Sequence, residues 1–62
     1  MYKFNVFEVK PSIINIIDRR SWVLIGSFYS LEEAQDFIQY KENQERDIEG
    51  FNRYLYNLEM TS

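Results

Sequence analysis

The sequence predicts a small α+β domain in the order βββα, with a three-stranded antiparallel β-meander over about residues 2–28 and one long helix over about residues 31–59. Apolar residues alternate with a period of two as far as Phe28, which is typical of strands, and follow a helical repeat beyond Ser30. The 62 residues suffice for one small domain, residues 1–62, whose core alone gives a thin margin of stability.

A capping box marks the change from one period to the other. In Ser30-Leu31-Glu32-Glu33, the Ser30 hydroxyl can accept from the Glu33 amide while the Glu33 carboxylate reaches back to the Ser30 amide. These two bonds satisfy backbone donors that the start of a helix leaves free. A helix is therefore expected to begin at Leu31.

The strands are assigned from β-forming residues and the breaks between them. Tyr2–Lys10 reads as the first strand, which ends at Pro11 because proline cannot donate to a sheet ladder. The isoleucine-rich segment Ile13–Ile17 reads as the second strand, and Asp18–Ser21 as a polar hairpin connection. Trp22–Phe28 reads as the third strand.

The third strand is apolar on both faces. Trp22, Leu24 and Phe28 alternate with Val23 and Ile25. A single helix can cover only one face of such a sheet, and the uncovered face of an antiparallel sheet is normally polar. The second face is therefore expected to need cover from another helix or from another chain.

The long helix has two alternative forms. A continuous helix from Leu31 to Glu59 would be about 43 Å long and would extend past the sheet. Gly50 is the competing signal, because glycine is unfavourable inside a helix and could separate it from a second helix that folds back over the sheet's other face.

The second half of this predicted helix carries an apolar stripe. The stripe favours a homodimer interface, because aromatic residues are enriched where proteins meet; if the chain breaks at Gly50, the same residues form the core of a second helix. The predicted interface residues are Ile48, Phe51, Tyr54, Leu55 and Leu58.

Charge is segregated along a chain whose net charge is −3. Residues 31–49 hold two basic side chains against seven acidic ones, which are Glu32, Glu33, Asp36, Glu42, Glu45, Asp47 and Glu49. Such a run is typical of a solvated helix face whose first-turn carboxylates favour the helix dipole. The functional alternative is an acidic surface that mimics DNA and inhibits a basic protein.

Arg19, Arg20 and Trp22 form the one polar and aromatic cluster that could contact a ligand. Arginine pairs with phosphate and an indole can stack on a base, so this cluster, together with the aromatic residues of the strands, predicts single-stranded nucleic-acid binding as an alternative function. Solvated arginines beside a core tryptophan are the structural alternative, and the negative net charge opposes phosphate binding.

Composition argues against catalysis. The chain has no His and no Cys, and it shows neither a glycine-rich phosphate loop nor a carboxylate pair placed for acid–base work. We therefore expect no enzyme activity, no catalytic residues, and no cofactor or metal site. With neither a signal peptide nor a membrane span in the sequence, a cytoplasmic location without membrane binding is expected.

The expected function is a small protein–protein interaction module. It would act as a homodimer that also binds an unidentified protein, with nucleic acid disfavoured as a partner. Richness in Asn, Ile, Tyr and Phe fits an AT-rich genome, so the chain is interpreted as an accessory protein of a phage or mobile element that modulates a host or phage enzyme.

Overall fold

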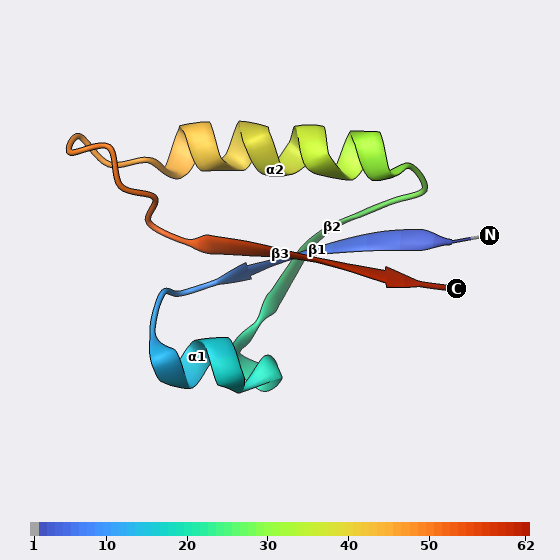
Figure 1. Cartoon of the computed structure of the whole chain (residues 1–62), viewed down its shortest axis with the longest axis horizontal. Helices are drawn as coiled ribbons and strands as arrows, with labels where there is room; N and C mark the ends of the chain where they lie inside the picture. The colour runs from blue at the N-terminus through green and yellow to red at the C-terminus, as the bar shows by residue number, and fades with distance from the viewer. Residues whose placement is uncertain (1) are drawn as a thin grey trace.

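The computed structural model describes residues 2–62 and shows three strands and one long helix in the order β-β-α-β, with a short helix after the first strand (Figure 1). The predicted α+β class, with a three-stranded antiparallel sheet and a long helix, is confirmed. In chain order the elements are β1 (Lys3–Val9), α1 (Ile13–Ile17), the 3-10 turn η1 (Arg19–Ser21), β2 (Val23–Phe28), α2 (Leu31–Glu45) and β3 (Leu55–Thr61).

The sheet has the order β2-β1-β3, so the first strand lies in the centre and both neighbours run antiparallel to it. The β1–β3 ladder is regular from Lys3 opposite Thr61 to Val9 opposite Leu55. The β1–β2 ladder shifts register between Val6 and Phe7, where β2 carries an extra residue. One edge of the sheet is therefore bulged and the other is regular.

The predicted strand at Ile13–Ile17 is wrong, because this segment forms α1. Ser12 is its N-cap, and the Ser12 side chain accepts from the Asn15 amide at 3.1 Å. Pro11 ends the sheet ladder just before it, so the isoleucines leave the sheet at the point where a cap is available. The following residues form η1 in place of the predicted hairpin connection.

Helix α2 begins at Leu31, as the capping box predicts, with Ser30 as its N-cap. The prediction that it extends to Glu59 is wrong, since it ends at Glu45, before Gly50. Arg46 already has extended backbone angles, and the Arg53 N–H group donates to the Glu45 carbonyl, which satisfies one of the acceptors at the helix end.

A turn centred on Asp47 reverses the chain after α2. The Asp47 side chain accepts from the amides of Glu49 and Phe51, each at 2.9 Å, as Asp does when it stabilises a turn. Gly50 has φ +88°, in the left-handed region that favours glycine. Gly50 thus belongs to a turn, neither inside a continuous helix nor between two helices.

The segment predicted as the end of the helix forms β3 instead. Tyr56, Leu58 and Met60 alternate with Asn57 and Glu59, which gives the strand two chemically different faces. The sheet therefore includes residues far beyond the predicted boundary at residue 28.

The sheet lies between two unequal layers, with α2 along one side and α1 on the other (Figure 1). Under α2, the Phe28 and Phe37 rings meet with centroids 5.2 Å apart. Gly26 lies beneath Phe37, and a Cβ atom there would come within 3.0–3.2 Å of both rings, so glycine allows the close approach. Among residues 2–62 the fully buried hydrophobic side chains are only Val6, Val9 and Ala34.

Candidate functional site

The most exposed apolar surface that belongs to a regular element is on α1. Ile13, Ile14 and Ile17 are each 75% exposed or more, and Ile16 is also exposed. Single exposed hydrophobic residues are normal on a protein surface, whereas four on one short helix form a patch of the kind that marks interaction sites. We call these four residues the isoleucine surface.

Polar bonds on the inner side of α1 explain why its isoleucines point outward. The Asn15 carbonyl accepts from the Trp22 indole Nε1 at 2.9 Å and from the Ser21 hydroxyl at 3.1 Å. A helix of five residues is not stable alone, so these bonds and the Ser12 cap hold it in place. These bonds use backbone and polar groups, so they leave the isoleucine side chains exposed.

The indole of Trp22 is enclosed from several directions. The Phe7 ring lies 5.8 Å from it between centroids, and the Arg19 guanidinium lies 5.3 Å from its centroid in cation–π geometry. Arg19 also forms an ion pair with Glu59 of β3. Trp22 is thus half-buried and already has aromatic and cationic neighbours.

Arg20 points away from this cluster and is paired with Asp18. Its Nε lies 3.0 Å from a carboxylate oxygen of Asp18, while the Arg20 side chain as a whole remains 91% exposed. Hydrogen bonds from the Arg20 side chain, and then from its backbone, hold the pKa of Asp18 below its usual value. The structure therefore separates the two arginines that the sequence placed together as a possible ligand contact.

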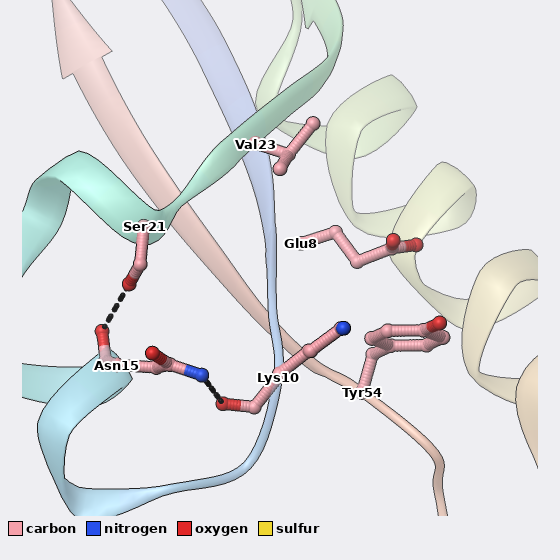
Figure 2. Close-up of a pocket in the computed structure, with 6 residues that line it drawn as sticks. All are labelled: Glu8, Lys10, Asn15, Ser21, Val23 and Tyr54. Atoms are coloured by element: carbon pink, nitrogen blue, oxygen red, sulfur yellow. Dashed lines mark hydrogen bonds between the residues drawn. The ribbon is translucent and has the colours of Figure 1, made fainter.

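A pocket of about 400 Å³ opens between α1 and the side of the sheet that α2 covers (Figure 2). Figure 2 shows the Lys10 side chain extending toward the Tyr54 ring, with the Glu8 carboxylate nearby. The pocket is lined by Glu8, Lys10, Asn15, Ser21, Val23 and Tyr54. This lining combines opposite charges and a phenol, and the hydroxyl of Ser21 is already bonded to two backbone carbonyls.

Tyr56 lies opposite Glu8 in the ladder and is the one strongly perturbed titratable group among the described residues. Burial, followed by the negative charges of Glu8 and Glu45, raises the pKa of Tyr56 to about 12. The Tyr56 hydroxyl is buried and makes no hydrogen bond of good geometry within residues 2–62, but the Glu8 side chain is within reach to accept from it, which also raises its pKa. A buried hydroxyl without a partner is a cost to stability.

The structure does not assemble the predicted interface residues into one stripe. Ile48 and Phe51 lie in the turn after α2 and are 104% and 67% exposed. Tyr54 lines the pocket, Leu55 begins β3, and Leu58 faces α2 opposite Val6. Whether they contact a partner stays a prediction, but their common helical face does not exist.

The acidic residues lie along α2 and in the turn that follows it, and they differ in exposure. Glu32, Glu33 and Asp36 are exposed near the start of α2, where carboxylates favour the helix dipole. Glu45 instead pairs with Lys41 one turn away, at 3.6 Å. Of the other three, Glu42 is in α2 and Asp47 and Glu49 are in the turn. The acids near the start of α2 thus form a solvated helix face, while Glu45 is partly covered.

Sequence reasoning missed the isoleucine surface because it placed these residues inside a sheet. A usable signal was present in Ser12, which is a favoured N-cap residue directly after Pro11 and before the isoleucines.

The chain matches no family model, no curated protein and no solved structure. Within residues 2–62, no group of three or more acidic side chains is placed to hold a metal ion. Neither described helix combines the length and apolar character needed to cross a membrane.

Proposed function

We propose that this protein is a small non-catalytic interaction module that forms a homodimer and binds another protein. The observation that carries the proposal is its unusually large exposed surface. The accessible area is 4817 Å², about 500 Å² more than the roughly 4,300 Å² expected of a folded monomer of 7.6 kDa. An accessible area larger than expected for a monomer supports assembly with another chain, which would cover part of it.

The isoleucine surface is the best candidate for contact with the target protein. Its four isoleucine side chains are exposed together on one short helix. A partner surface with an apolar centre would complement it. An accessory protein of a phage or mobile element, acting in the cytoplasm, would use such a surface to modulate an enzyme.

The first test is the solution mass of the wild-type protein by light scattering at several concentrations. We expect the mass to rise from 7.6 kDa toward twice that value as the concentration increases through the micromolar range. A mass that stays at 7.6 kDa up to about 100 μM would contradict the homodimer.

The nucleic-acid alternative receives no support from a specific contact. Arg19 is paired with Glu59, Arg20 is paired with Asp18, and the Trp22 ring already packs against Phe7. It stays a prediction that is tested by the anisotropy of a labelled single strand at low salt. Salt-dependent binding that is lost in Arg19→Glu with Arg20→Glu would revive it.

A further inference from the structure

The open edges of the sheet differ in how well they are protected. Edge strands expose unpaired N–H and C=O groups, and proteins protect them with bulges, proline or lysine. The β2 edge carries the bulge that shifts its register against β1. Neither edge strand contains proline or lysine, so the bulge is what distinguishes them: β3 has seven regular pairs with β1 and carries Glu59 as its one charged residue.

We propose that β3 pairs with β3 of a second copy, antiparallel and centred on Leu58, so that two sheets join into one of six strands. This inference rests on the proposed homodimer and specifies its interface. A two-fold axis perpendicular to the sheet maps β3 onto itself in the antiparallel direction and keeps each side chain on its own face. Such an axis must pass through the position of one residue, because opposed residues share a face.

Strand length selects Leu58 as that residue. Leu58 is the middle residue of Leu55–Thr61, so this register alone pairs every residue of the strand with the second copy. A centre at Asn57 would leave the last residues of the strand beyond the ladder. A centre at Glu59 would shorten the ladder and place two carboxylates opposite each other, which is destabilising.

Side-chain chemistry agrees with this register on both faces. On the α2 side, Leu58 meets its own copy, and Tyr56 meets Met60, which is 59% exposed in the isolated chain. On the α1 side, Asn57 meets Glu59, so an amide can donate to a carboxylate across the interface. The apolar row under α2 thus continues from one sheet into the other.

Single cysteines test the register cleanly, because the chain has no cysteine of its own. Directly opposed residues have Cα atoms about 4.5–5.5 Å apart, within the range that a disulfide can bridge. Under mild oxidation, Leu58→Cys should form a covalent dimer. Leu24→Cys is the matched control, at a residue that is 55% exposed on the β2 edge. It should form at least about tenfold less covalent dimer than Leu58→Cys under the same oxidation.

A mixed pair avoids disturbing the residue under α2. Asn57→Cys and Glu59→Cys should cross-link when mixed, and each alone should cross-link poorly, because only the mixture places two thiols opposite each other.

Dimer affinity gives a second test. Met60→Lys should raise the dimer Kd by about tenfold or more, since each dimer loses the Met60 contact twice, whereas Leu24→Lys should leave the Kd unchanged. Circular dichroism checks that each variant remains folded.

The outcomes separate this inference from the proposed function. Cross-linking through Leu58 and through the mixed pair supports the β3 interface. A dimer that cross-links through Leu24→Cys, or that Met60→Lys leaves intact, overturns the β3 interface but leaves the homodimer in place. A wild-type protein that remains monomeric up to about 100 μM overturns both.

Discussion

The two faces of the sheet are covered by different kinds of interaction. On one face, α2 packs Phe37 against Phe28 over a glycine, so the cover is apolar. On the other, the Phe7–Trp22 ring contact is joined by hydrogen bonds to the Asn15 carbonyl and by the Arg19–Glu59 ion pair, so polar bonds take a larger part in holding α1 and η1. A helix that is attached by packing buries its apolar side chains. A helix that is attached by polar bonds can keep its apolar side chains outside, where they are free to bind.

The largest loss of stability is expected on the face where apolar packing attaches α2 to the sheet. Phe37→Ala should lower the free energy of unfolding by about 2–3 kcal/mol, somewhat below the range for a fully buried phenylalanine because Phe37 is only partly buried. Denaturant unfolding measures this change.

The matched change on the other face is Ile17→Ala, at a residue that is 75% exposed. It should change the stability of the monomer by less than about 0.5 kcal/mol. An equal loss in the two variants would break the comparison, because it would show that the isoleucines are packed against the domain.

A smaller loss of stability is expected where a hydrogen bond helps to attach α1. Trp22→Phe keeps a ring beside Phe7 but removes the indole N–H donor to Asn15, which should cost about 1–2 kcal/mol. Thermal unfolding should show a loss of roughly 4–8 °C per kcal/mol for a domain of this size.

Tyr29→Phe, at a ring that is 66% exposed, is the control for Trp22→Phe and should leave the melting temperature unchanged. If Trp22→Phe were equally silent, the indole bond would not be what holds α1.

The smallest effect is expected at Tyr56. Because its hydroxyl has no partner, Tyr56→Phe should be neutral or stabilising by up to about 1 kcal/mol at pH 7. The folded pKa of about 12 lies above the ordinary value of 10.0, so the ionisation of Tyr56 does not affect stability below pH 10 and lowers it as the pH rises toward 12.

The difference in stability between Tyr56→Phe and the wild type should therefore grow in favour of the variant between pH 10 and pH 12. Tyr40→Phe, at an exposed residue, is the control for the other groups that titrate in this range. A constant difference across these pH values would mean that Tyr56 ionises normally.

Local signals in the sequence were sufficient to predict the element boundaries that a cap or a proline sets. The Ser30 cap gave the start of α2, and Pro11 gave the end of β1. The β2 strand lies within the predicted third strand, one residue shorter.

The segments that were assigned wrongly have residues that fit a strand and a helix about equally well. Ile13–Ile17 has strand composition, but its backbone is set by the Ser12 cap and by donors at residues 21 and 22, beyond the segment itself. For β3, the alternation of Tyr56, Leu58 and Met60 was available, but a helical spacing through Leu55 and Leu58 fitted as well. Only pairing with β1, which no local pattern shows, decides in favour of the strand.

The candidate site was less predictable than the fold. The interface stripe depended on a continuous helix, and the turn at Asp47 removes that helix. The arginine cluster depended on a hairpin tip, whereas η1 turns Arg19 toward Glu59, a residue that is distant in sequence. The isoleucine surface became visible only once α1 replaced a strand.

The central position of β1 has a consequence for synthesis of the protein on the ribosome. β1 is made before its neighbours, yet its ladder with β3 pairs Lys3 with Thr61 and Val9 with Leu55. A nascent chain therefore carries its central strand half-paired until β3 has emerged, and long-range pairing of this kind slows folding. We expect the sheet to close only after translation of β3, so that earlier intermediates depend on α2 to keep the central strand from aggregating.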